Sequence, residues 1–161
     1  MVKSSRTASK TDGELAYVLL RATLGLNILM HGLSRLLAGT GTFARTLVPM
    51  FAKTPLPSWS VYVFGLALPF IETLLGILLL VGLKTRWALV GGCGLLFVLT
   101  FGSSLRQDWE ITALQLIYTV VYTALLAGIR WNWFSMDTLL QRPADDCAPC
   151  SGSAGSTEGY S

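Results

Sequence analysis

Two long apolar stretches of this chain carry ionisable side chains that lipid cannot pair. The first stretch contains Arg21 and His31, and the second contains Glu72. A charge at the centre of a membrane helix costs roughly 2.5–3.5 kcal/mol on insertion scales, and such residues usually mark a functional site. An imidazole and a carboxylate can both handle protons and form hydrogen bonds with a ligand. We therefore expect His31 and Glu72 to be the catalytic residues of an intramembrane site.

The polar residues of the first stretch fall on one side of a helix. At about 100° per residue, Arg21, His31 and Arg35 lie within about an 80° arc, and Asn27 lies about 40° beyond it. Lipid offers this stripe no hydrogen-bond partner, so we expect it to face other helices. Arg21 is predicted to pair with Glu72, and Arg35 to reach the membrane surface. The pairing is compatible both with a purely structural role and with proton handling by Glu72.

The second and last apolar stretches each present a face that suits close contact or ligand binding. Gly65, Pro69, Glu72 and Gly76 share an arc of about 60°, which indicates tight helix packing. In the last stretch, Gln115, Tyr118 and Tyr122 line one face.

Tyrosines at this spacing often serve packing alone. If they face His31 and Glu72, however, they complete an apolar pocket with a few convergent polar groups, which is typical of small-molecule sites. The predicted ligand-binding residues are Arg21, Asn27, Gln115, Tyr118 and Tyr122.

The elements that must position these residues are membrane helices. Of the 161 residues, 52% are hydrophobic and 13% are charged, with a mean hydropathy of +0.57. A soluble domain has roughly 25% charged residues. The four apolar stretches are residues 15–37, 60–83, 87–105 and 111–129. Each is close to the roughly 20 residues that a helix needs to cross the hydrocarbon core. We predict an all-α integral membrane protein that forms a four-transmembrane-helix bundle.

The chain divides into a polar segment 1–14, a membrane domain 15–142 and a tail 143–161 that we predict to be disordered. The long connection 38–59 has apolar residues at helical spacing, namely Phe43, Leu47, Met50 and Phe51. They predict a short helix on the membrane surface that ends at Pro55 and Pro57. After the fourth stretch, Trp131, Trp133 and Phe134 suggest an interface anchor, and Ser135 suits the N-cap of a helix 136–141.

Charge and cysteine content narrow the partners and the location. The side of the membrane that holds both termini carries seven cations, and the other side carries four. The seven are Lys3, Arg6, Lys10, Lys84, Arg86, Arg130 and Arg142, and the four are Arg35, Arg45, Lys53 and Arg106. This bias predicts cytoplasmic termini in the cell's inner (plasma) membrane.

No basic patch interleaved with aromatics points to nucleic acid. Cys93, Cys147 and Cys150 form no disulfide framework. The C-x-x-C of the tail lacks the further ligands of a haem or zinc site, so no metal is expected.

Two segments resemble a known family. LLRATLGLNILMHGLSRLLAG is similar to the first span of the DoxX-like membrane proteins, and LPFIETLLGILLLVGLKTRWA matches their Glu-x3-Gly-x5-Gly-x3-Arg run. The ending NWFSMDTLLQ resembles the Ser-Leu-Asp-x-Leu-Leu ending of the DoxD branch, the membrane subunit of thiosulfate:quinone oxidoreductase. The resemblance covers roughly residues 15–142.

This resemblance implies a small membrane subunit of a redox complex with a protein partner. It also implies a quinone-like ligand near His31 and Glu72, with Arg21 in the first-span motif. The alternative is a non-catalytic accessory subunit that stabilises a larger respiratory or photosynthetic membrane assembly.

Overall fold

The computed structural model describes residues 3–132 and residue 136, and within this part every regular element is helical. The elements are α1 (Lys3–Leu37), α2 (Thr40–Met50), α3 (Ser58–Val81), α4 (Thr85–Leu105), α5 (Trp109–Ala127) and the 3₁₀ helix η1 (Ile129–Trp131). Four of these helices are long and apolar enough to cross a membrane, with the first crossing segment at Asp12–Leu37. The predicted four-helix membrane bundle is confirmed. α1 begins about a dozen residues before its apolar part, because no proline interrupts the polar start of the chain.

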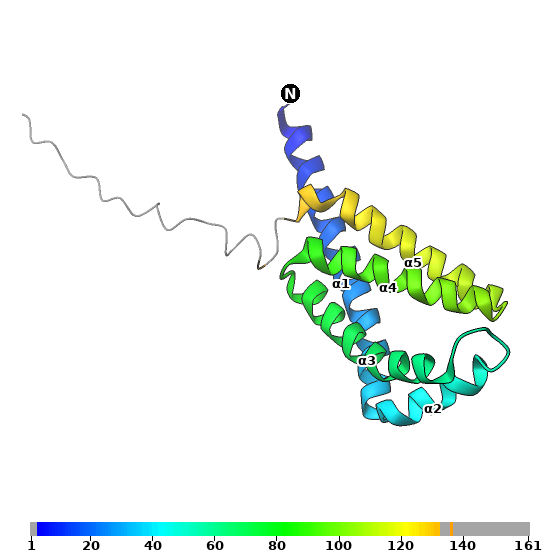
Figure 1. The fold of residues 1–161 in the computed structure, drawn as a ribbon. Coiled ribbons are helices and arrows are strands. Elements are labelled where there is room, and N and C mark those ends of the chain that lie inside the picture. The colour runs from blue at the N-terminus through cyan, green and yellow to red at the C-terminus, as the bar shows by residue number, and fades with distance from the viewer. Residues whose placement is uncertain (1–2, 133–135, 137–161) are drawn as a thin grey trace, which may run out of the picture.

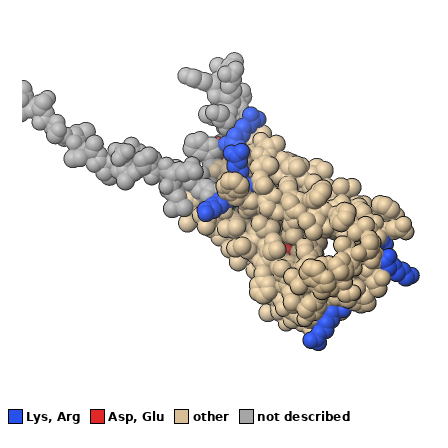
Figure 2. Space-filling model, viewed as in Figure 1, with Lys and Arg blue, Asp and Glu red and all other residues tan. Residues whose placement is uncertain are grey.

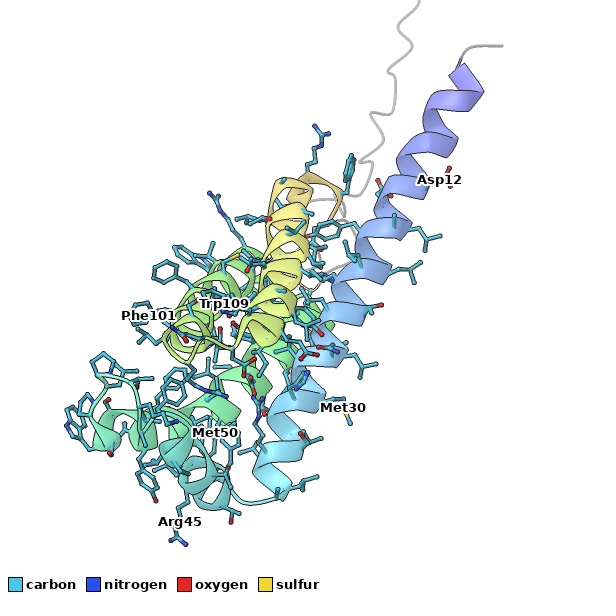
Figure 3. The ribbon with its side chains drawn as sticks, turned by 90° about the vertical axis from the view of Figure 1, so that its right-hand side faces the viewer. Asp12, Met30, Arg45, Met50, Phe101 and Trp109 are labelled. Atoms are coloured by element: carbon cyan, nitrogen blue, oxygen red, sulfur yellow. The ribbon has the colours of Figure 1, made fainter. Side chains whose placement is uncertain are left out.

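The helices form two packed pairs (Figure 1). α1 lies against α3, while α4 and α5 form an antiparallel hairpin whose α4 also contacts α3. α2 packs on the first half of α3, at the end of the molecule opposite the N-terminus. The view in Figure 3 shows the same arrangement, with Asp12 and Arg45 at opposite ends.

The contact between α1 and α3 depends on glycines. The backbone of Leu29 lies so near Gly76 that a Cβ atom there would be 2.6 Å from the Leu29 Cα. Gly32 lies equally close to the backbone of Thr73. All four residues of the predicted packing arc of α3, Gly65, Pro69, Glu72 and Gly76, are buried. The prediction of a closely packed α3 face is therefore confirmed.

α2 confirms the short helix predicted in the first connection, with two differences. It ends at Met50, before Pro55 and Pro57, because the chain turns there through hydrogen bonds from the Phe51 and Ala52 amides to Val48 and Pro49 carbonyls. Of the four predicted apolar residues, Phe43, Leu47 and Met50 lie on α2 and Phe51 lies directly after it. They line a cavity inside the molecule, which is described below.

The other end of the bundle is closed by η1. Trp131 packs on Gly13 of α1, and the Arg130 guanidinium stacks over the Trp131 ring at 4.7 Å. The remaining predictions for this region concern Trp133, Phe134, Ser135, the helix 136–141 and the tail with Cys147 and Cys150. All of these residues lie outside the described part of the chain, except Met136 at the start of the predicted helix 136–141.

Candidate functional site

Glu72 of α3 forms an ion pair with Arg35, in the last turn of α1. The Glu72 side chain is 7% exposed and that of Arg35 is 27% exposed. The prediction that Glu72 pairs with Arg21 is wrong, and so is the prediction that Arg35 reaches for the membrane surface. The antiparallel register of α1 and α3 explains both. Because Gly32 lies beside Thr73, Arg35 comes level with Glu72.

Arg21 has a different set of partners. It lies eight residues before Leu29, the residue that opposes Gly76, and this separation is about 12 Å along the helix. Arg21 is buried, and its Nη1 donates a hydrogen bond to Asn132 Oδ1 at 2.8 Å. Asn132 Nδ2 in turn donates to Thr85 Oγ1 at 3.1 Å. Arg21 thus joins α1 to the chain after η1 and, through Asn132, to the start of α4.

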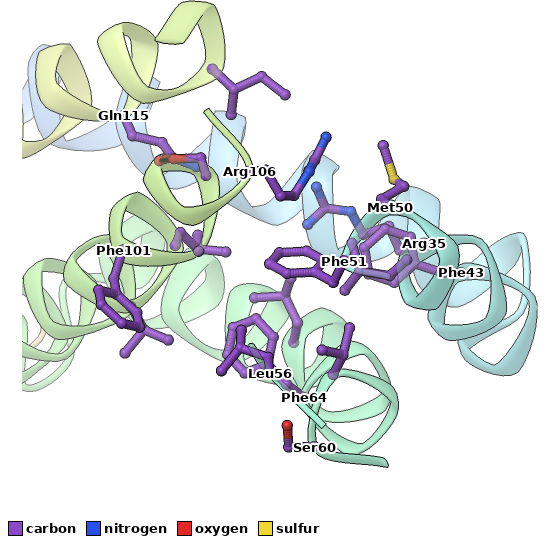
Figure 4. Close-up of a pocket in the computed structure, with 18 residues that line it drawn as sticks. Arg35, Phe43, Met50, Phe51, Leu56, Ser60, Phe64, Phe101, Arg106 and Gln115 are labelled. Atoms are coloured by element: carbon purple, nitrogen blue, oxygen red, sulfur yellow. Dashed lines mark hydrogen bonds between the residues drawn. The ribbon is translucent and has the colours of Figure 1, made fainter. Parts of the chain in front are cut away.

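A cavity of about 470 Å³ lies between α2, the first half of α3, the second half of α4 and the start of α5. It appears as a hole through the space-filling view (Figure 2), and its lining is drawn in Figure 4. Most of the wall is apolar, and the polar side chains in it are Arg35, Ser60, Ser103, Arg106 and Gln115. The apolar lining residues are Phe43, Leu47, Met50, Phe51, Leu56, Val61, Phe64, Leu68, Val98, Leu99, Phe101 and Ile111.

The two arginines of the cavity are held in similar ways. The Arg35 guanidinium lies 4.8 Å from the centroid of the Phe43 ring and pairs with Glu72. The Arg106 guanidinium lies 5.3 Å from the centroid of the Phe51 ring and pairs with Asp108 at 3.1 Å. Each positive charge is therefore compensated by a carboxylate and packed on an aromatic face. Figure 4 shows both side chains near Phe51, entering from different helices.

A hydroxyl cluster orients Gln115 at the far wall. The Ser103 hydroxyl donates to Gln115 Oε1 at 2.8 Å and lies 2.8 Å from Thr112 Oγ1. Thr112 Oγ1 donates to the Asp108 carbonyl at 2.8 Å. Because the Gln115 amide oxygen is engaged, its NH₂ group is the part that remains to serve as a donor.

The structure does not gather the predicted site residues around Glu72. Gln115 lines the cavity. Glu72 does not line it, but it forms the ion pair with Arg35, which does. Tyr118 packs at the edge of the apolar core, and Tyr122 is buried where its ring touches Gly92.

Asn27 and His31 also lie away from the cavity. Asn27 is half-buried on α1, and His31 is exposed on the same helix. Neither lines the cavity. The predicted convergence of His31 with Gln115 and Tyr118 is therefore not found, and the predicted catalytic role of His31 stays a prediction.

From the sequence, Arg106 is only one of the four cations on one side of the membrane, and Phe51 is only part of a predicted surface helix. Arg106 closes α4, and Phe51 lies directly after α2, so only folding brings them together. Their separation of 55 positions leaves no local pattern to find. Among residues 3–132 and 136, no three His, Cys, Asp or Glu side chains are placed to hold a metal ion.

These features define a small multi-pass helical membrane protein with an apolar cavity between its helices. A family model described as DoxX matches residues 16–104, more than half of the chain, and the chain belongs to the DoxX family. Comparisons with curated proteins and with solved structures give no match. The matched region contains Arg35 and Glu72 and ends before Arg106 and Gln115.

Proposed function

We propose that this chain is a small membrane subunit of a redox complex, related to the subunit of thiosulfate:quinone oxidoreductase, and that a quinone-like ligand occupies its cavity. The observation that carries the proposal is the cavity itself. Its volume of about 470 Å³ falls in the usual range for ligand pockets, roughly 300–1,000 Å³. Apolar walls with a few fixed polar groups favour a flat, largely apolar molecule with carbonyl oxygens.

The charge balance of the wall favours a neutral ligand over an anion. A guanidinium has five N–H donors, so pairing with one carboxylate leaves donors for a second acceptor. Since Glu72 and Asp108 already compensate Arg35 and Arg106, an anion would have to compete with these carboxylates. A carbonyl oxygen accepts a hydrogen bond without that competition.

The residues of the cavity then have distinct tasks. Arg35, Arg106 and the Gln115 amide would donate hydrogen bonds to carbonyl oxygens, while the phenylalanine rings exclude water. Glu72 acts as a positioning residue, because it holds the Arg35 side chain. A bound quinone supplies two-electron acceptor chemistry.

The route into the cavity leads from the lipid. Met50, Val98, Phe101 and Ile111 line the cavity and are also exposed on the surface of the bundle. These side chains form an apolar rim that lipid tails would touch in a bilayer. A ligand dissolved in the membrane can therefore enter sideways and leave its tail in lipid.

A binding titration with decylubiquinone on the detergent-purified protein tests the site. Val98→Trp fills the cavity and is expected to abolish binding, while Gln115→Leu removes one donor and should weaken it about three- to tenfold. Val120→Trp, an exposed position on α5 away from the cavity, is the matched control and should bind like wild type. Unchanged affinity for decylubiquinone in a folded Val98→Trp protein would show that the ligand does not bind in the cavity.

The accessory-subunit alternative is favoured by one observation, the outward position of His31 on a membrane helix. A polar side chain there has no partner in lipid and suits contact with another protein. Purification in mild detergent separates the two proposals. Bound quinone on the isolated chain supports the redox role, whereas a large partner assembly without bound quinone supports the accessory role.

We also propose that both termini face the cytoplasm of a cell with the protein in its plasma membrane. Lys84, Arg86 and Arg130 are exposed beside the start of α4 and on η1, and Trp131 of η1 packs on Gly13 of α1. The exposed cations Arg45 and Lys53 lie on α2 and shortly after it, and Figure 3 shows Arg45 at the end of the molecule away from Asp12. Because Arg35 and Arg106 are engaged at the cavity, the bias toward the terminal side is larger than the sequence count indicates. A reporter fused after Ser161 should be active only in the cytoplasm, and activity on the outer side would reverse the orientation.

A further inference from the structure

The turn between α4 and α5 brings the side chains of Arg106 and Asp108 together. The Asp108 amide donates a hydrogen bond to the Ser103 carbonyl at 3.0 Å, which closes the turn. Gln107, between the two charged residues, has a left-handed backbone with a φ of 58°, and this reverses the direction of the chain. Arg106 Nη2 therefore lies 3.1 Å from Asp108 Oδ2, although the residues are only two positions apart.

The two carboxylate oxygens of Asp108 have different partners. Oδ2 pairs with Arg106, whereas Oδ1 accepts a hydrogen bond from the Ile111 amide at 3.4 Å and so caps the first turn of α5. An asparagine side chain caps a helix about as well as an aspartate does. Asp108→Asn is therefore expected to keep the start of α5 and to remove only the negative charge.

Without that negative charge, Arg106 would present an unbalanced cation to the cavity. Its side chain is 17% exposed, and its guanidinium lies 5.3 Å from the centroid of the Phe51 ring (Figure 4). Water screens a charge in such surroundings poorly. The guanidinium has five N–H donors, so it can bind an anion from the cavity side. The N-terminus of α5, which Asp108 caps, adds a partial positive charge nearby.

A cavity that opens to lipid is exposed to anions as well as to neutral molecules. Membranes contain amphiphilic anions, such as fatty acids, whose apolar tails suit the same walls and the same rim of Met50, Val98, Phe101 and Ile111. Shape and hydrophobicity do not exclude them. The charge of the wall is the property that separates an anionic headgroup from an uncharged one.

We propose that Asp108 is the specificity-determining residue of the cavity: by neutralising Arg106 it excludes amphiphilic anions and admits ligands with an uncharged headgroup. This inference rests on the proposed function, because it concerns the ligand of the same cavity. It assigns the choice between neutral and anionic ligands to one carboxylate. Since Glu72 still balances Arg35, the loss of Asp108 alone makes the wall positive.

A matched pair of ligands tests this assignment. One is a hydroxynaphthoquinone with a decyl tail, whose hydroxyl group is ionised at neutral pH, and the other is its uncharged methyl ether. Both are titrated into the purified full-length protein in an uncharged detergent. Wild type should bind the ether more tightly than the anion. In Asp108→Asn the ratio of the two affinities should move toward the anion by about ten- to a hundredfold.

Three further variants control for fold and for long-range charge. Glu110→Gln removes a negative charge from an exposed position in the first turn of α5 that does not line the cavity, and it should leave the ratio unchanged. The double variant Arg106→Gln/Asp108→Asn should lose the gain for the anion, because the cation that attracts it is gone. Asp108→Ser keeps a capping hydroxyl and repeats the test if circular dichroism shows that Asp108→Asn is poorly folded.

The outcomes separate this inference from the proposed function. An unchanged ratio in folded Asp108→Asn, with the ether still bound by wild type, would overturn the role of Asp108 and leave the proposed function standing. An equal shift in Glu110→Gln would also overturn it, because long-range charge and not the pair with Arg106 would then make the choice. If wild type binds neither compound, the proposed function fails and this inference fails with it.

Discussion

Glu72→Gln or Arg35→Leu alone is expected to lower the free energy of unfolding by about 3 kcal/mol, because each leaves a charged partner inside the bundle. Removing one partner of a buried ion pair usually costs about 3–5 kcal/mol. Glu72 is almost fully buried, but Arg35 is partly exposed at the cavity, so the loss should be near the lower end of that range. The double variant Arg35→Leu/Glu72→Gln should recover much of it, since no isolated charge remains. Unfolding by SDS titration in mixed micelles, followed by circular dichroism, measures all three.

Arg21 provides the control for this pair. Since Arg21 bonds to Asn132 and not to Glu72, the losses in Arg21→Leu and Glu72→Gln should add in the double variant. Coupling of Arg21 with Glu72, together with additive losses for Arg35 and Glu72, would contradict the ion pair described here. It would restore the pairing predicted from the sequence.

Gly76→Ala and Gly32→Ala are each expected to destabilise the protein by about 1–3 kcal/mol, because at both positions the added methyl group meets backbone atoms that cannot rotate away. At Gly76 the new Cβ would lie 2.6 Å from the Leu29 Cα, and at Gly32 it would lie 2.6 Å from the Thr73 amide nitrogen. α1 and α3 must move apart to accept it. The same SDS titration gives the change in stability.

Gly94→Ala is the matched control on α4. A Cβ at Gly94 would have no atom within 4 Å, so alanine should be neutral or stabilising by up to about 1 kcal/mol through its higher helix propensity. Equal losses at Gly94, Gly32 and Gly76 would show that the effect comes from glycine in membrane helices generally. Separation of α1 from α3 should also disturb the Arg35–Glu72 pair, and so weaken any ligand bound in the cavity.

The amino-acid sequence by itself determined the helices and their burial. Lipid satisfies no backbone group, so four apolar stretches of bilayer length can only be helices, and their predicted limits agree with α3, α4 and α5 to within two residues. The small residues around Glu72 likewise indicated a buried face, because close approach of two helices requires them. These features depend on composition and local period.

The tertiary structure alone decided which charges meet and where a ligand can bind. The contacts of Gly32 and Gly76 set the register of α1 on α3. In this register Arg35 forms the ion pair with Glu72, and Arg21 lies near Asn132 and donates a hydrogen bond to it. A helical wheel predicts the direction in which a side chain points, but it does not predict which residue of a neighbouring helix lies at the same level along the helix axis. In the same way, the apolar face of α2 could not be assigned to membrane surface or cavity until α3, α4 and α5 were placed around it, because lipid and a cavity wall select the same residues.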